Sequence, residues 1–198
     1  MPDRRTIIFG PLLICAATPL GEARVAAARP LAPTPTCGDH DRGPTAAETE
    51  GPYFKPRSPE RISLLDPGLA GSRLVLLGRV LAPDCRPIAG ALLDFWQADG
   101  TGAYDNAGYR CRGHQFTDAD GRYRLVTVMP GSYPGRTRHI HVKVQARGGP
   151  LLTTQLYFPG EQRNRSDPLF RPDLLVTIPA EPEENGALAG FDFVVRTG

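Results

Sequence analysis

Short apolar runs separated by turn residues fill most of the chain, and the clearest alternation lies at residues 139–144. This segment reads His-Ile-His-Val-Lys-Val, so a strand here would direct successive side chains to opposite faces. The three aliphatic residues would then face a core, whereas His139, His141 and Lys143 would share the other face. The pattern therefore predicts a strand that carries two imidazoles side by side.

Similar runs predict further strands over residues 74–81, 91–97, 115–117, 122–128, 152–158, 174–178 and 191–195. Turn residues separate the runs, and between two of them Asp118–Gly121 predicts a hairpin turn with its glycine in the left-handed region. No long apolar pattern of helical period appears. The chain is therefore expected to be all-β, a β-sandwich with long irregular loops.

The N-terminal region has a different composition from the rest. Arg4 and Arg5 precede an apolar stretch, and small residues suited to cleavage follow, so residues 1–28 predict a signal peptide, similar to the twin-arginine type. A disordered extension is the alternative. Residues 29–48 are rich in Pro, Thr and Ala and predict a linker or surface arm. Residues 49–198 then form one domain, which we expect to be exported to the periplasm or the medium.

Net charge limits the binding partners that are expected, and the cysteine content limits the disulfides. A formal net charge of +2 does not favour nucleic acid, and the N-terminal apolar stretch is too short and interrupted for a stable membrane span. Homo-oligomer formation stays open. Without the leader, Cys37, Cys85 and Cys111 remain, which allows one disulfide and one free thiol in an oxidising compartment. Cys85, in a turn between two predicted strands, is the favoured disulfide partner.

The paired histidines are candidates for a metal site. Adjacent imidazoles on one strand face suit a transition metal better than packing, although two surface histidines are the commoner meaning of a bare His-x-His. The metal is favoured here because the chain has only 4 histidines and because Tyr133 and Arg136 lie just upstream.

Several segments together resemble the intradiol ring-cleavage dioxygenases, in that family's order. They are Trp-Gln-Ala-Asp-Gly at 96–100, Gly-Arg-Tyr-Arg at 121–124, Pro-Gly-Ser-Tyr-Pro at 130–134, His-Ile-His at 139–141 and Thr-Gln-Leu-Tyr-Phe at 154–158. The resemblance covers roughly residues 49–178. It implies a non-haem Fe(III) enzyme that cleaves a catechol-type aromatic between its two hydroxyl-bearing carbons with O2, giving a cis,cis-muconate-type diacid.

Mapped residue by residue, the resemblance implies that Tyr104, Tyr133, His139 and His141 bind the iron. Phenolate is a hard, anionic donor that suits ferric iron, and ligation would deprotonate a phenol whose ordinary pKa is about 10. This donor set differs from the two-histidine, one-carboxylate Fe(II) sites that activate oxygen. The site is therefore expected to activate the organic substrate.

The resemblance also implies residues that act on the substrate. Arg136, three positions before His139, would stabilise the electron-rich form of the bound ring, and Gln155 would hydrogen-bond Arg136. With Tyr133, these two residues form the expected catalytic set. The remaining assignments are Gly51, Pro52 and Tyr53 at the substrate mouth, and Trp96 and Tyr157 as supports behind the ligands.

Two other functions compete with this interpretation. Strand–turn–strand units like residues 74–97 also occur in transthyretin-like modules, so a secreted, non-enzymatic β-sandwich binding module is one alternative. The other is a protein that binds copper or zinc for different chemistry. Colour separates the three, because ferric tyrosinate absorbs visible light, whereas a zinc protein and a metal-free module do not.

Overall fold

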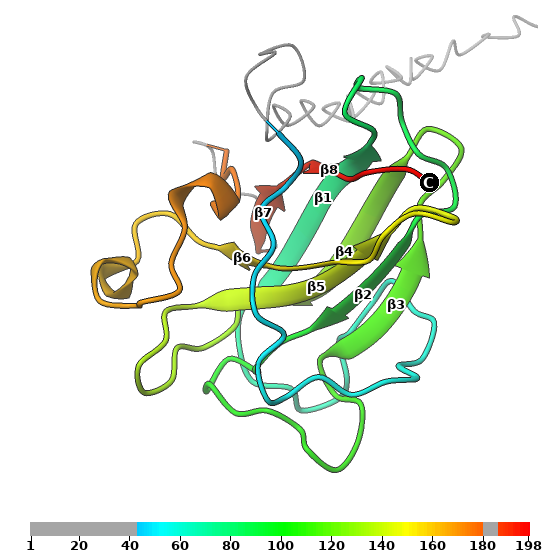
Figure 1. Ribbon diagram of the computed structural model, residues 1–198. Coiled ribbons are helices and arrows are strands. Elements are labelled where there is room, and N and C mark those ends of the chain that lie inside the picture. The colour runs from blue at the N-terminus through cyan, green and yellow to red at the C-terminus, as the bar shows by residue number, and fades with distance from the viewer. Residues whose placement is uncertain (1–42, 180–185) are drawn as a thin grey trace, which may run out of the picture.

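Alternating apolar side chains pack two β-sheets face to face in the computed structural model, which describes residues 43–179 and 186–198 (Figure 1). The first sheet has the order β4-β1-β7, and β8 pairs with the far end of β1. Its strands are β1 (Arg73–Leu81), β4 (Arg122–Val128), β7 (Ala187–Gly190) and β8 (Phe193–Val194). β4 runs antiparallel to β1, whereas β7 and β8 run parallel to it.

The second sheet is antiparallel throughout and has the order β3-β2-β5-β6. Its strands are β2 (Leu92–Trp96), β3 (Arg112–Phe116), β5 (His139–Gln145) and β6 (Leu152–Tyr157). The predicted all-β sandwich is therefore confirmed. The alternation predicted for residues 139–144 is also correct, because Ile140, Val142 and Val144 are fully buried in the core between the sheets.

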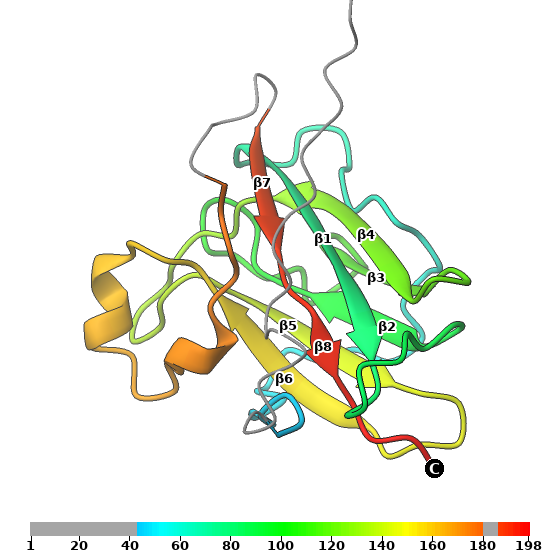
Figure 2. The same ribbon diagram turned by 90° about the horizontal axis from the view of Figure 1, so that it is seen from above.

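The outer face of the second sheet is covered as well. The chain from residue 43 begins beside β8 of the first sheet, where the Thr45 N–H donates to the Val194 carbonyl at 2.9 Å. It then crosses the second sheet over β6 and β5 (Figures 1 and 2). The Glu48 N–H donates to the Thr153 carbonyl at 2.8 Å, and the Thr154 hydroxyl donates to the Ala46 carbonyl at 2.7 Å. The last residues of the predicted linker, 43–48, thus pack against the domain.

The strand predicted at residues 174–178 is wrong. A 3-10 helix, η2 (Pro172–Leu174), begins this segment, and a second one, η1 (Gln162–Arg165), lies just before it. Beyond η2 the chain makes single bridges, from Leu175 to Tyr157 of the second sheet and from Thr177 to Gly190 of the first. The segment crosses between the sheets, so it stays too briefly beside either one to form a ladder.

Two further differences have similar causes. Gly121 does adopt a left-handed conformation, with φ of 71°. Its turn is no hairpin, however, because β3 and β4 belong to different sheets and do not pair. β7 precedes the run predicted at residues 191–195; its Ala-Leu-Ala-Gly sequence gives little strand signal, and its place beside β1 comes from tertiary pairing.

The cysteines follow the sequence expectation where the structure describes them. Cys85 is disulfide-bonded, and Cys111 is a buried free thiol whose pKa is raised to about 11, chiefly by burial. Cys37 and the predicted leader lie outside the described residues. Among the residues that are described, no helix is long and apolar enough to cross a membrane.

Gly78 of β1 offers a test of how closely the chain between β7 and β8 packs against β1 within the first sheet. A Cβ atom added there would lie 1.8 Å from the Phe191 carbonyl oxygen, a backbone atom that cannot swing aside. We expect Gly78→Ala to lower the free energy of unfolding by on the order of 3 kcal/mol, the upper range for overpacking. Gly43→Ala is the control, because its Cβ would meet nothing within 4 Å. Urea denaturation measures both, and equal stabilities would contradict this packing.

Candidate metal centre and substrate site

The register of the second sheet gathers one half of the candidate site. His141 pairs with Trp96 of β2 and with Gln155 of β6, and His139 pairs with Tyr157. Cross-strand partners project to the same face, so these five side chains share the outer face of the sheet. The Trp96 and His141 rings stack at 4.8 Å with an interplanar angle of 8°. Both histidines are only 2% exposed, which excludes the surface-histidine alternative.

The tyrosines come from loops at the same end of the sheet. Tyr104 lies between β2 and β3, and Tyr133 begins a tight turn in which the Arg136 N–H donates to the Tyr133 carbonyl at 3.0 Å. Pro134 followed by Gly135 at a φ of 79° is typical of a type II turn. The turn aims the Tyr133 side chain and the Arg136 side chain at the histidines.

Four donor atoms converge as a result. The Nε2 atom of His139 lies 3.1 Å from Nε2 of His141, 3.4 Å from the Tyr133 hydroxyl and 3.5 Å from the Tyr104 hydroxyl. All four predicted ligands are thus brought together. The described residues contain no cluster of three or more His, Cys, Asp and Glu side chains that could hold a metal, so the phenols are what complete this donor set.

Hydrogen bonding and burial set the protonation of the histidines. Nδ1–H of His139 donates to the Thr137 carbonyl at 2.7 Å, which leaves the Nε2 lone pair directed at the cluster. Burial, with the nearby Arg136 cation, lowers the pKa of His139 to about 4. Burial and the proximity of His139 hold the pKa of His141 well below its ordinary value. Both imidazoles are therefore neutral near pH 7 and able to act as ligands.

The donor set fits ferric iron. Burial raises the pKa of Tyr104 and of Tyr133, so both phenols keep their protons until a cation draws them off. Ligands that share one ion through bonds of about 2.1 Å stand roughly 3 to 3.5 Å apart, which is the spacing found here. Two phenolates and two neutral imidazoles would reduce a charge of three to one, so burial of such an ion becomes tolerable.

The residues expected to act on the substrate lie beside this cluster. Arg136 donates to the Gln155 side-chain oxygen, as expected, and the Gln155 amide group donates to the Thr49 carbonyl at 3.0 Å. The Tyr157 hydroxyl donates to the Leu169 carbonyl at 2.8 Å and lies 3.2 Å from the same Gln155 oxygen. Gln155 thus links Arg136 to the segment that covers the sheet.

That covering segment carries the predicted mouth. Gly51 has a φ of 68°, and a Cβ atom there would lie 3.5 Å from Cε1 of His141, so its backbone lies beside the Cε1–Nε2 edge of this ring. Pro52 is exposed, and Tyr53 stacks on Tyr104 with 4.3 Å between ring centroids. All the predicted site residues therefore lie in one neighbourhood.

Three contributing residues escaped the sequence analysis as site residues. Asp167 receives the Arg136 guanidinium, and Arg112, which is 2% exposed, donates to the carbonyls of Tyr53 and of Asp105. Lys143 pairs with Glu50 and lies 3.5 Å from the Phe54 ring centroid. Lys143 could have been found, because it shares a face with the histidines. No local pattern marks Asp167 or Arg112, since both act through long-range contacts.

Known proteins share this arrangement of sequence and fold. A family model described as Dioxygenase matches residues 49–197 of the chain. The protocatechuate 3,4-dioxygenase beta chain of Burkholderia cepacia is 32% identical over 148 residues. The chain belongs to the intradiol dioxygenase family. The match covers 62% of this chain and 63% of the Burkholderia protein, which is less than two thirds of either length.

Solved structures agree with this membership. The dioxygenase domain of a dioxygenase carbohydrate-binding protein fusion from Streptomyces sp. SirexAA-E is 54% identical to this chain, with a TM-score of 0.75. That likeness covers 79% of this chain and all of the Streptomyces domain. For the 3-chlorocatechol 1,2-dioxygenase of Rhodococcus opacus, the identity is 28% and the TM-score 0.73, over 78% of this chain and 73% of the other.

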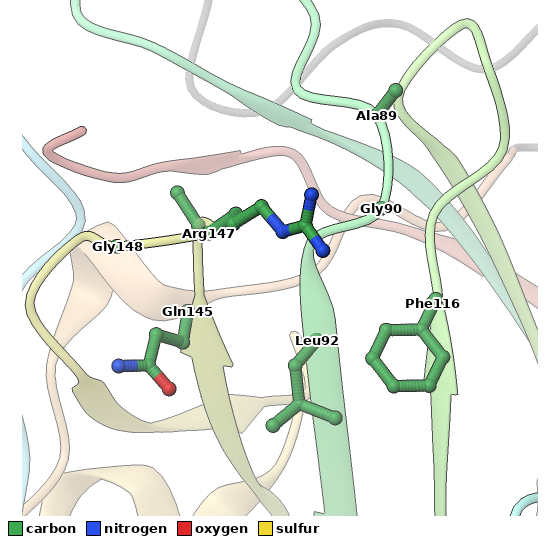
Figure 3. Close-up of a pocket in the computed structure, with 8 residues that line it drawn as sticks. Ala89, Gly90, Leu92, Phe116, Gln145, Arg147 and Gly148 are labelled. Carbon is green, nitrogen blue, oxygen red and sulfur yellow. The ribbon is translucent and has the colours of Figure 1, made fainter. Parts of the chain in front are cut away.

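A separate pocket of about 530 Å³ lies on the same sheet as the candidate metal centre (Figure 3). Leu92, Phe116 and Gln145 line it from neighbouring strands, with Arg147 and Gly148 at its border. Leu92 pairs with Gln145 at one end of the β2–β5 ladder, whereas Trp96 pairs with His141 at the other. The pocket is therefore distinct from the candidate metal centre.

The affinity for Fe(III) tests whether the four predicted residues are the metal ligands. Tyr133→Phe removes one phenol oxygen, so it should shift the visible charge-transfer band and weaken Fe(III) binding roughly tenfold or more. Tyr109→Phe is the matched control, because its hydroxyl donates to the Pro56 carbonyl away from the cluster. Titration of the metal-stripped proteins with Fe(III), followed by absorption, measures both effects. An unchanged spectrum in Tyr133→Phe would remove this residue from the ligand set.

Proposed function

We propose that the chain is a non-haem Fe(III) intradiol dioxygenase that cleaves a catechol-type ring between its hydroxyl-bearing carbons with O2 and releases a cis,cis-muconate-type diacid. The observation that carries the proposal is the convergence of two phenol oxygens and two imidazole nitrogens beside the Arg136 guanidinium. Tyr104, Tyr133, His139 and His141 would hold the iron. When bound, the iron would act as a Lewis acid that holds the substrate and draws electron density from it.

The two tyrosines are suited to different tasks. The Tyr104 ring stacks on the Tyr53 ring, and Tyr104 is the more deeply buried of the two phenols. Tyr104 is therefore suited to remain a metal ligand when the substrate binds. Tyr133 stands on a four-residue turn with Gly135 in it, where a small backbone change swings the side chain. A catechol that binds through both oxygens must lose two protons. The Tyr133 oxygen is the protein atom best placed to accept one of them.

Arg136 supplies a fixed positive charge. Burial alone would lower the pKa of its guanidinium, but the hydrogen bond and charge of Asp167 raise it, so Arg136 stays a cation at every working pH. A cation that is already oriented stabilises negative charge that accumulates on the ring without further reorganisation. Gln155 holds a second edge of the same planar group.

The covering segment keeps bulk water from the reacting ring. The Thr49 carbonyl is tied to Gln155, Glu50 is ion-paired with Lys143, and Phe54 packs edge-on against Trp96 at 4.9 Å. These contacts hold the backbone of Gly51 beside His141. Exclusion of water strengthens the electrostatic interactions inside the site and protects the reactive form of the substrate.

Export of the protein is part of this proposal and rests on the sequence pattern at residues 1–28 alone. The main test of function is oxygen uptake by the iron-loaded protein across a panel of substituted catechols, with the products identified by mass spectrometry. Ring-opened diacids that contain both atoms of O2 support the proposal. A colourless protein that consumes no oxygen would favour the transthyretin-like binding module.

Arg136→Ala separates substrate activation from metal binding. Arg136 supplies none of the four donor atoms, although its hydrogen bond and charge act on the Tyr133 phenol. Iron content and the colour of the resting protein should therefore stay nearly unchanged. Turnover should fall by a factor on the order of a hundred, the scale for loss of one preorganised charged group. Arg122→Ala serves as the control, because Arg122 pairs with Asp120 on the surface. Full activity in Arg136→Ala would disprove the role assigned to this residue.

A further inference from the structure

We infer that Asp167 is the positioning residue that fixes the orientation of Arg136 toward the reacting ring, an inference that rests on the proposed function. Asp167 lies beyond the segments whose resemblance suggested the site, in the loop between η1 and η2. Its carboxylate is buried and is not one of the four donors of the candidate metal centre. Its contacts show what it does.

The Asp167 carboxylate has a complete set of hydrogen bonds. Its Oδ2 atom accepts from Nε of Arg136 at 3.0 Å and from the Thr137 N–H at 2.8 Å. Its Oδ1 atom accepts from the Leu169 N–H at 2.9 Å and lies 3.2 Å from the same Nε. The Asp167 side chain is 1% exposed and that of Arg136 is 14% exposed, so water competes little for this pair.

The loop that carries Asp167 is itself held in place. The Phe170 N–H donates to the Asp167 carbonyl at 3.1 Å, and the Asp167 N–H donates to the Arg163 carbonyl at 3.0 Å. The Tyr157 hydroxyl, from the edge of the sheet, donates to the Leu169 carbonyl. Asp167 is therefore a fixed anchor, not a side chain that follows wherever Arg136 goes.

Two anchors determine the rotation of the guanidinium. Asp167 holds its Nε edge, and Gln155 holds Nη2. A planar group bound along two edges cannot turn about its last side-chain bond, so less freedom is lost when the substrate arrives. Thr137 links the same anchor to the metal side, because its N–H donates to Asp167 and its carbonyl accepts from His139. The position of the Arg136 guanidinium is thereby fixed relative to His139, one of the proposed metal ligands.

Charge and orientation predict opposite effects on binding and turnover. Replacement of Asp167 by Asn removes a negative charge next to Arg136, so an anionic catecholate should bind as well as before or better. The guanidinium, however, loses one anchor and turns, and small misplacements of a reacting group cost up to on the order of a hundredfold in rate. We expect Asp167→Asn to lower kcat by roughly ten- to a hundredfold while KM stays the same or falls. A general loss of folding would lower the folded, iron-loaded fraction, so kcat is expressed per bound iron, and the inference expects the fall in kcat to remain after this correction.

A double-mutant cycle tests whether Asp167 acts through Arg136. The experiment compares Asp167→Asn, Arg136→Ala and the double variant for kcat, KM, iron content and the visible spectrum. If the inference is right, Asp167→Asn added to Arg136→Ala should slow turnover less than about threefold further, because contacting residues in one network are not additive. Effects that multiply fully in the double variant would overturn it, as would an unchanged kcat in Asp167→Asn.

Controls separate this inference from the proposed function. Asp173→Asn is the matched control, since Asp173 is exposed and pairs with Arg171. If Asp167→Asn does not fold, Arg136→Lys decides, because an ammonium keeps the charge but cannot bind Asp167 and Gln155 along two edges. Turnover within threefold of Arg136→Ala supports the inference, and wild-type turnover overturns it. A wild-type protein that binds iron and consumes no oxygen with any catechol refutes the proposed function and this inference with it, whereas an active wild type beside an equally active Asp167→Asn refutes the inference alone.

Discussion

Burial of polar groups on the outer face of the β3-β2-β5-β6 sheet is the constraint on which the rest of the structure depends. A sheet in a sandwich usually packs one face on the core and leaves the other to water. Here the outer face carries His139, His141 and Gln155, each no more than 2% exposed. Buried polar groups need partners, and strands cannot supply them on a face that has no second sheet. Irregular segments from several parts of the chain supply them instead.

These irregular segments are ordered by hydrogen bonds of their own. In the loop of Tyr104, the Asp105 carboxylate accepts from the N–H groups of Gly108 and Arg110, and its carbonyl accepts from the Arg112 side chain. Asp99 plays a similar part at the start of the same loop. These hydrogen bonds therefore fix the backbone of the loop that carries Tyr104. A long loop can hold a site residue in place because hydrogen bonds between its polar side chains and its backbone replace the hydrogen bonds between strands.

Sequence reasoning succeeded where the chemistry lies in local patterns. Short apolar runs between turn residues located β1, β2, β4, β5 and β6, and the spacing of His139 and His141 identified their shared face. It failed where structure comes from distant partners: residues 174–178 look like a strand but pass from one sheet to the other. Asp167 and Arg112 are missed for the same reason. Nothing beside them in the chain shows which cation or carbonyl they meet across the fold.

Two of the hydrogen bonds of Gln155 have a consequence for attempts to change the substrate range by protein engineering. One side of its amide group receives Arg136, and the other side donates to the Thr49 carbonyl in the covering segment. The proposed entrance and the Arg136 guanidinium therefore share one support, so a redesign that shifts the backbone at residue 49 would also move Arg136. Pro52 is exposed. Side-chain variation there could reshape the entrance while the shared support remains in place, which makes it the sounder starting point for a mutant library.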